Sequence, residues 1–209
     1  MTAAALRSPA EVRVTFDGQS LCNYPDPPNN APTLVMAGLG VPWANVALNG
    51  IGWYDLAGTV TTRRDPQSPA SRAGKLDVLV MLGGQSDVYA AAPSGDQTGA
   101  TIYDRAVSYA TSARAAGFDR VLLCTLPPMG PNAYGLGIPT ASPAQAITDF
   151  NTLALANSGG FEAVADLHVP PLDDSSSTTY YLDRLHWTAA GAVAAASIIR
   201  AALLPLLTP

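Results

Sequence analysis

Apolar runs typical of β-strands alternate along this chain with segments of helical periodicity. Such alternation predicts a parallel sheet whose faces are covered by helices. We find no internal repeat and no domain boundary, so residues 1–209 are expected to form one domain. The expected strands are Glu11–Phe16, Trp43–Leu48, Asp77–Leu82, Arg120–Thr125 and Glu162–Asp166.

Three helices are expected, and each has a local signal at one end. Gly117 ends the first, because glycine readily adopts the left-handed conformation that follows many helices. Ser142 and Pro143 begin the second, as a capping side chain followed by proline at the first helical position. The third is rich in alanine and ends at Pro205. The expected ranges are Thr101–Ala116, Ser142 to about Asn157, and Thr188 to about Leu204.

Two proline-rich stretches interrupt this alternation, at Cys22–Pro32 and Pro127–Pro143. The first follows the first expected strand, and the second follows the fourth. In a parallel sheet covered by helices, both emerge at the carboxyl ends of the strands, where ligands bind. A binding site is therefore expected at this edge.

The composition favours a compact globular protein, with 48% hydrophobic and 13% charged residues. The net charge is −5 and no basic cluster exceeds the pair Arg63-Arg64, so nucleic acid is not an expected partner. No apolar run is expected to reach the length of a membrane span, and Met1–Pro9 lacks the apolar core of a signal peptide. We therefore expect a soluble chain, and its compartment stays open between the cytoplasm, a virion and others.

The cysteines and histidines argue against metal chemistry. Cys22 and Cys124 lie far apart without C-x-x-C spacing and are expected to be free thiols. Neither His168 nor His186 has a second ligand at metal spacing, so no metal or other cofactor is expected. His168 has no partner motif and is expected to be structural.

The tripeptide Gly-Gln-Ser occurs at residues 18–20 and again at residues 84–86, each time after an expected strand. A serine on a sharp turn at the end of a strand exposes its hydroxyl beside backbone N–H donors, as nucleophilic catalysis requires. Ser20 and Ser86 cannot both be the nucleophile. His186 is the better partnered base, because the carboxylate of Asp183 can fold back onto its imidazole.

Segments of the chain resemble the sequence blocks of the SGNH (GDSL-type) hydrolases, in the same order. Phe16–Leu21 resembles the G-D-S-L block, and Asn45–Gly50 resembles the second block, a strand that ends in glycine. Gly83–Asp87 resembles G-x-N-D, and Asp183–His186 resembles D-x-x-H. Each block alone is weak, but the ordered set spans residues 16 to 186.

The resemblance implies a three-layer α/β/α fold with a flavodoxin-like, five-stranded parallel sheet. It also implies ester hydrolysis through an acyl-enzyme on Ser20, with His186 as the base and Asp183 as its partner. The implied oxyanion hole consists of the backbone N–H groups of Ser20 and Gly50 and a side-chain donor at Ser86.

Two residues depart from the family pattern. Gln19 replaces the Asp of G-D-S, as in relatives that read G-Q-S-N and act on acetylated sugars. Ser86 replaces the Asn of G-x-N-D with a shorter hydroxyl, and the loss of one oxyanion donor typically costs about a hundred- to a thousand-fold in rate. Either Ser86 or a water substitutes for the amide, or Gln85 reaches in, or activity is low.

Neighbouring residues are expected to support the site. Asp87 is expected to brace the third block by accepting backbone N–H bonds. Gly52 is the alternative to Gly50 as an N–H donor. Five aromatic residues are candidates for a pocket wall or for substrate contact, unless they are core residues. They are Tyr24, Trp53, Tyr54, Tyr134 and Trp187.

The leading hypothesis is a serine esterase that removes a short acyl group, such as acetyl, from a carbohydrate. A lipase or thioesterase with the same mechanism is the first alternative. A weakly active domain that binds cell-surface glycans, as in bacteriophage tails, is the second. An α/β-hydrolase is rejected, because Cys22 stands where G-x-S-x-G requires its second glycine and Ser20 follows the first strand.

Overall fold

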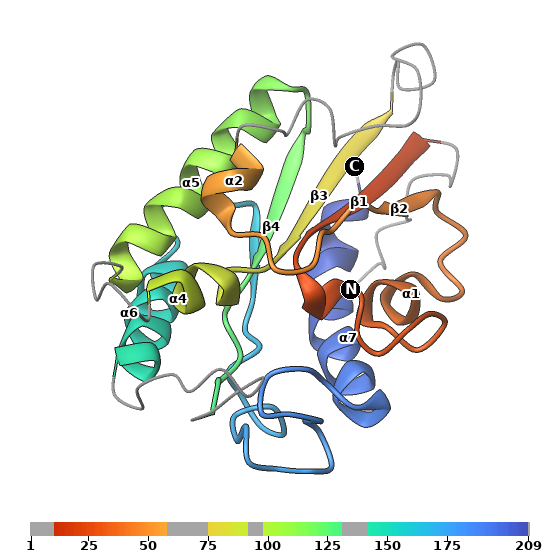
Figure 1. Ribbon diagram of the computed structural model, residues 1–209. Helices are drawn as coiled ribbons and strands as arrows, with labels where there is room; N and C mark the ends of the chain where they lie inside the picture. The colour runs from red at the N-terminus through yellow and green to blue at the C-terminus, as the bar shows by residue number, and fades with distance from the viewer. Residues whose placement is uncertain (1–10, 58–74, 92–97, 131–141, 209) are drawn as a thin grey trace.

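The computed structural model describes residues 11–57, 75–91, 98–130 and 142–208 (Figure 1). At its centre is a five-stranded sheet in the order β2-β1-β3-β4-β5, in which every strand is parallel to its neighbours. This is the flavodoxin-like sheet that the resemblance implied. The strands are β1 (Val12–Gly18), β2 (Trp43–Asn45), β3 (Leu76–Leu82), β4 (Arg120–Cys124) and β5 (Ala163–Ala165).

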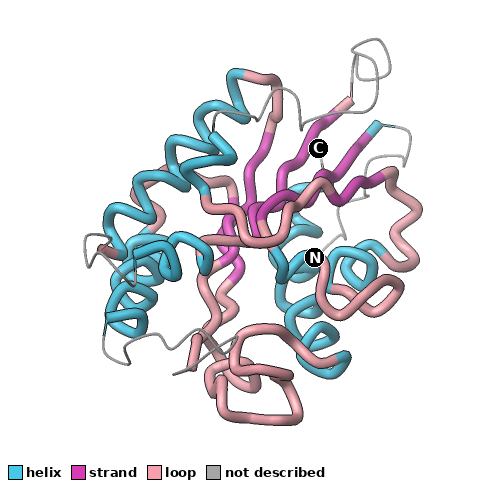
Figure 2. Tube along the Cα trace, viewed as in Figure 1, coloured by secondary structure: helices cyan, strands magenta, loops and turns pink. Residues whose placement is uncertain are grey.

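Helices cover both faces of the sheet, which confirms the three-layer arrangement (Figures 1 and 2). The helices on one face are α1 (Ala31–Met36) and α7 (Ala189–Leu203). Those on the other face are α2 (Trp53–Ala57), α4 (Gln85–Ala91), α5 (Gly99–Ala115) and α6 (Ser142–Ala156). Two short 3-10 helices are η2 (Ser20–Cys22) and η5 (Leu204–Leu207).

The central strands bury side chains on both faces, because successive residues of a strand point to opposite sides. In β3, Val78 and Val80 pack on the side of α1 and α7, whereas Leu79 and Met81 pack on the side of α5 and α6. All four side chains are completely buried. This explains why the strands are nearly continuous apolar runs in the sequence.

Local signals define the ends of the longer helices. Thr98 accepts a hydrogen bond from the N–H of Thr101 at the start of α5, and Thr188 accepts one from Gly191 at the start of α7. Gly117 follows α5 with a φ of 97°, as expected. The sequence does not predict α1, α2 or α4, because a segment of five to seven residues is too short to show a helical period.

The expectation that no apolar run reaches the length of a membrane span is wrong. Ala189–Leu207 is long and apolar enough to cross a membrane, with a mean hydropathy of 1.9. In the fold this segment is α7 followed by η5, and its residues Ala192, Ala195, Ile199 and Leu203 are completely buried in the core. A core helix of this kind is apolar because one side of it packs against the sheet.

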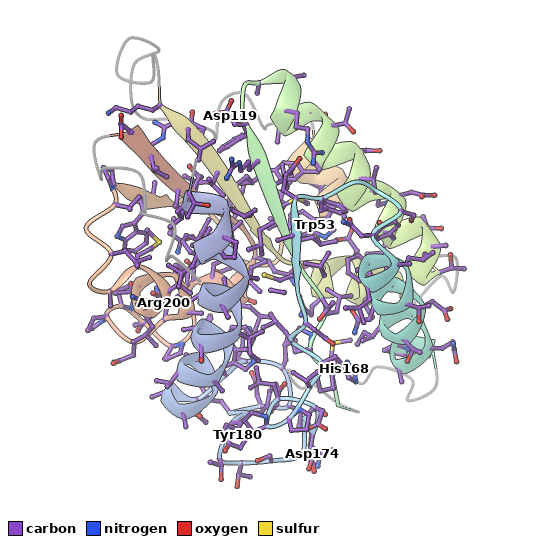
Figure 3. The ribbon with its side chains drawn as sticks, turned by 180° about the vertical axis from the view of Figure 1, so that it is seen from behind. Trp53, Asp119, His168, Asp174, Tyr180 and Arg200 are labelled. Carbon is purple, nitrogen blue, oxygen red and sulfur yellow. The ribbon has the colours of Figure 1, made fainter. Side chains whose placement is uncertain are left out.

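The long segment between β5 and α7 lies beyond the carboxyl ends of the strands. Figure 3 shows Asp174 and Tyr180 in this segment, at the opposite end of the molecule from Asp119, which precedes β4. The segment carries the D-x-x-H block, so it brings Asp183 and His186 to the edge of the sheet at which β1 and β3 end.

Candidate active site

The first Gly-Gln-Ser forms a tight turn at the end of β1. Gly18 pairs with Leu82 of β3, and a Cβ on Gly18 would lie 1.9 Å from the carbonyl oxygen of Leu82. Because Gly18 also has a φ of 147°, any other residue here would be both strained and in collision. The N–H of Gln19 donates to the same carbonyl at 3.2 Å. The turn therefore leaves the partly exposed Ser20 beyond the end of the sheet.

Ser20, His186 and Asp183 form a connected set of hydrogen bonds. Ser20 Oγ lies 2.9 Å from His186 Nε2, and His186 Nδ1 lies 2.7 Å from Asp183 Oδ2. The serine and the histidine are 166 positions apart in the chain, and the histidine is only 4% exposed. A base that contacts a serine hydroxyl and is itself oriented by a carboxylate is the arrangement required to activate a serine nucleophile.

The carboxylate of Asp183 determines which imidazole nitrogen carries a proton. Its Oδ1 accepts the backbone N–H groups of Leu185 at 3.1 Å and His186 at 2.7 Å, which leaves Oδ2 for the ring. Burial raises the pKa of Asp183, but the hydrogen bonds and charge of His186 and the N–H of Leu185 lower it by more, so the net pKa lies below its ordinary value. The ionised carboxylate therefore holds a proton on Nδ1, so that the nitrogen facing Ser20 Oγ is the hydrogen-bond acceptor of the imidazole.

The second Gly-Gln-Ser lies beside the first, because β1 and β3 are neighbours. Gln19 Oε1 accepts the backbone N–H of Ser86 at 2.8 Å, and Gln19 Nε2 donates to Gln85 Oε1. Gln19 and Gln85 are 1% and 2% exposed, whereas Ser86 is half-buried. Gln85 Nε2 is buried and has no hydrogen-bond partner among the residues that the structure describes. Of the two candidates for the third oxyanion donor, Gln85 therefore has the N–H that the fold leaves unused.

Solved structures of esterases and lipases share this architecture. The acetyl xylan esterase AlAXEase superposes with a TM-score of 0.68 at 18% identity, over 91% of this chain and 99% of its own. A lipolytic protein of the G-D-S-L family from Veillonella parvula gives 0.63 at 12% identity, over 93% and 97%. The lipase/acylhydrolase from Enterococcus faecalis gives 0.60 at 17% identity, over 93% and 96%. This chain has the SGNH hydrolase fold. No family model and no curated protein matches the sequence itself.

Within the SGNH fold, Asp87 connects the third block to the start of α2. Its Oδ2 accepts the backbone N–H of Trp53 at 2.9 Å, and its Oδ1 lies 3.4 Å from Arg105 Nη1. A Cβ on Gly52 would lie 2.8 Å from the same carboxylate, so glycine allows this close approach. The expected acceptor bond to backbone N–H is present, but its donor, Trp53, lies outside the third block.

Gly50 lies in an exposed turn with a φ of 74°. The strand before it, β2, ends at Asn45 rather than at the predicted Leu48. The chain nevertheless continues beside β1, since Val46 and Leu48 donate backbone hydrogen bonds to the carbonyls of Phe16 and Gly18. The turn therefore reaches the edge of the sheet that carries Ser20, and the N–H of Gly50 as an oxyanion donor stays a prediction.

Hydrogen bonds of asparagine side chains connect the turn of Gly50 to the turn of Ser20. Asn45 Nδ2 donates to Asn23 Oδ1 at 2.9 Å and to the carbonyl of Cys22 at 3.1 Å. Asn23 Nδ2 donates in turn to Asn49 Oδ1 at 2.7 Å. Asn45 and Asn49 both belong to the second block. Their role could not be predicted because Asn23 belongs to another segment, which only the pairing of β1 and β2 brings near.

The aromatic candidates have different locations. The ring of Tyr24 lies 4.5 Å from that of His186 between centroids, at an interplanar angle of 37°, so this side chain contacts the histidine itself. Trp53 and Trp187 are 1% and 0% exposed, which makes them core residues rather than walls of an open pocket. Two candidates lie outside the described parts of the structure, namely the side chain of Tyr54 and the whole of Tyr134.

His168, Cys22 and Cys124 are not part of the connected set of Ser20, His186 and Asp183. His168 Nδ1 lies 3.2 Å from Asn151 Nδ2 and 3.3 Å from the carbonyl of Leu126, as expected of a structural histidine. Cys22 and Cys124 are buried and form no disulfide, as expected, and burial raises the pKa of Cys124. Among the residues that the structure describes, no group of three His, Cys, Asp or Glu side chains could hold a metal ion.

Proposed function

We propose that this protein is a serine hydrolase that cleaves carboxylic esters through an acyl-enzyme on Ser20. The observation that carries the proposal is the pair of contacts around His186. Ser20 Oγ lies 2.9 Å from Nε2, and Asp183 Oδ2 lies 2.7 Å from Nδ1. Both distances are short enough for proton transfer at Nε2 while Nδ1 keeps its proton.

The first half of the reaction acylates the serine. His186 Nε2 takes the hydroxyl proton while Ser20 Oγ forms a bond to the carbonyl carbon, and the π electrons of the carbonyl move onto its oxygen. The tetrahedral intermediate then breaks its bond to the alcohol oxygen, which leaves with the proton from His186. The ionised Asp183 stabilises the imidazolium between these two steps.

The second half of the reaction releases the acid. A water molecule loses a proton to His186 and attacks the acyl carbon, and the bond to Ser20 Oγ breaks as the oxygen recovers its proton. The products are the carboxylic acid and the original serine, so no redox change and no co-reactant besides water is involved.

The oxyanion of each intermediate needs N–H donors that are already in place. We propose the backbone N–H groups of Ser20 and Gly50 and the side-chain N–H of Gln85. Gln85 is favoured over Ser86, the alternative from the sequence, because Gln85 Nε2 is buried and has no hydrogen-bond partner in the described parts of the chain. The backbone N–H of Ser86 already donates to Gln19.

For the substrate we propose a short acyl group, such as acetyl, on a carbohydrate. Gln19 supports this proposal through the resemblance to G-Q-S-N relatives, and so does the similarity to an acetyl xylan esterase over 91% of the chain. Action on longer acyl chains is the second candidate, because a lipase/acylhydrolase shares the fold. A series of p-nitrophenyl esters from acetate to palmitate separates them, and a preference for palmitate would exclude the acetyl proposal.

Covalent labelling by a fluorophosphonate tests the hydrolase itself. We expect labelling of the wild-type protein, its loss in Ser20→Ala and its retention in Ser86→Ala. The second variant is a matched control, because it removes the hydroxyl from the other copy of the same tripeptide. A folded wild-type protein that is neither labelled nor able to hydrolyse any ester would instead support a glycan-binding domain.

A further inference from the structure

The side chain of Gln19 connects the first block to the third. It belongs to the residue before Ser20 and is 1% exposed. Its Oε1 accepts the backbone N–H of Ser86 at 2.8 Å, and its NH2 group donates to the side-chain oxygen Oε1 of Gln85. These two bonds cross 67 and 66 positions of the chain, so Gln19 bridges the turns that end β1 and β3.

The backbone determines the direction of these two hydrogen bonds. The N–H of Ser86 can only donate, so the atom of Gln19 that faces it must be the oxygen. The other end of the Gln19 amide is then an NH2 group, to which Gln85 must present its own oxygen. Gln85 Nε2 is therefore the atom at the end of the chain of amides. It is one of three buried side-chain N or O atoms without a hydrogen-bond partner among the described residues.

We propose that Gln19 is a positioning residue that orients the side-chain amide of Gln85. In this orientation the Nε2–H group of Gln85, rather than Oε1, faces the oxyanion. The inference rests on the function proposed above. A buried N–H without a hydrogen-bond partner lowers the stability of a fold. A donor that is already oriented and excluded from water, however, stabilises the negative charge that develops on the oxyanion during the reaction. A carboxylate at position 19 cannot donate a hydrogen bond to Gln85 Oε1. This orientation of the Gln85 side chain therefore depends on the amide of Gln19.

The variant Gln19→Glu tests this role because it keeps the size and shape of the side chain. Its carboxylate still accepts the N–H of Ser86, but its second oxygen faces Gln85 and requires the NH2 group there. The oxygen of Gln85 then takes the place of the donor. With p-nitrophenyl acetate at pH 8, we expect kcat to fall about a hundred-fold, with KM changed by less than about three-fold.

A double-mutant cycle shows whether Gln19 acts through Gln85. In a Gln85→Ala background there is no amide to orient, so adding Gln19→Glu should change kcat by less than about three-fold. An equal loss in both backgrounds would overturn the proposal, since Gln19 would then act on Ser20 or on the fold directly. Wild-type kcat in Gln19→Glu or in Gln85→Ala would overturn it as well.

Asp77→Asn is the control for damage to the fold. Asp77 is 3% exposed and accepts two hydrogen bonds from Arg13, at 2.9 and 3.0 Å, near the start of β3 and therefore at the opposite end of that strand from Gln85. We expect its melting temperature to fall while kcat and KM of the folded enzyme are retained. A wild-type protein without labelling or hydrolysis refutes the proposed function, whereas an active wild type with an unaffected Gln19→Glu refutes only the positioning role.

Discussion

Replacement of Asp183 by asparagine changes one oxygen of the candidate triad into an NH2 group. The oxygen that remains must face the backbone N–H groups of Leu185 and His186, because these groups can only donate. The new NH2 group therefore takes the place of Oδ2, 2.7 Å from His186 Nδ1. At that position it donates a hydrogen bond where the carboxylate accepted one.

This reversal disables the base. His186 must then accept at Nδ1 and carry its proton on Nε2, which lies 2.9 Å from Ser20 Oγ and can no longer take the hydroxyl proton. The equivalent substitution in a serine-protease triad lowers kcat by about ten-thousand-fold. That factor corresponds to about 5.4 kcal/mol of transition-state stabilisation, at about 1.36 kcal/mol for each factor of ten.

The assay is hydrolysis of p-nitrophenyl acetate by Asp183→Asn, together with its thermal unfolding. We expect the loss in kcat in a protein that still unfolds cooperatively, because every contact of the side chain keeps a heavy atom in place. Asp174→Asn is the control, since Asp174 lies in the same long segment and its side chain accepts hydrogen bonds from the backbone N–H and the hydroxyl of Ser176, at 2.8 and 2.6 Å. A folded Asp183→Asn that retains kcat within about ten-fold of the wild type would refute the reasoning.

The remaining predictions concern packing and ionisation. Gly18→Ala should lower the free energy of unfolding in urea by at least about 3 kcal/mol, whereas Gly38→Ala, whose φ is 73° and whose added Cβ meets nothing within 4 Å, should cost only about 1 kcal/mol. Equal losses would contradict the collision at Leu82. A thiol reagent at pH 8 should modify neither Cys22 nor Cys124 in the native protein, but both after denaturation. Rapid modification of the native protein would contradict the burial of these side chains. The pKa of Asp183 in the folded protein lies below its ordinary value, so the ionised carboxylate stabilises the folded state. This stabilisation is complete above the ordinary pKa of about 4 and is lost as the pH falls through the lower pKa of the folded state. Acid titration followed by circular dichroism should therefore show a steeper loss of stability in the wild type than in Asp183→Asn, and equal slopes would contradict the lowered pKa.

The elements that could be predicted are those with local causes. Leu76–Leu82 is recognisable as a strand because both of its faces are buried, so its residues form a continuous apolar run. The start of α7 is marked by the side chain of Thr188, which caps the helix within one turn. The contact between Asp183 and His186 has the same local origin, since three positions separate the two residues.

Other features depend on segments that are distant in the chain. Trp187 follows His186 directly, yet it is completely buried in the core on the side of α1 and α7. The sequence places Gln19 beside the nucleophile, but its partners, Gln85 and Ser86, become visible only when β1 pairs with β3.

The sequence by itself therefore determined the layered α/β architecture, the order of the blocks and the local pairing of Asp183 with His186. Periodicity, capping and short turns depend on residues within one strand or one helical turn, so they can be recognised without the fold. The tertiary structure decided that Ser20 meets His186 across 166 positions and that the two copies of Gly-Gln-Ser are joined through their amides. These contacts are set by strand order and register, which result from packing both faces of the whole sheet at once.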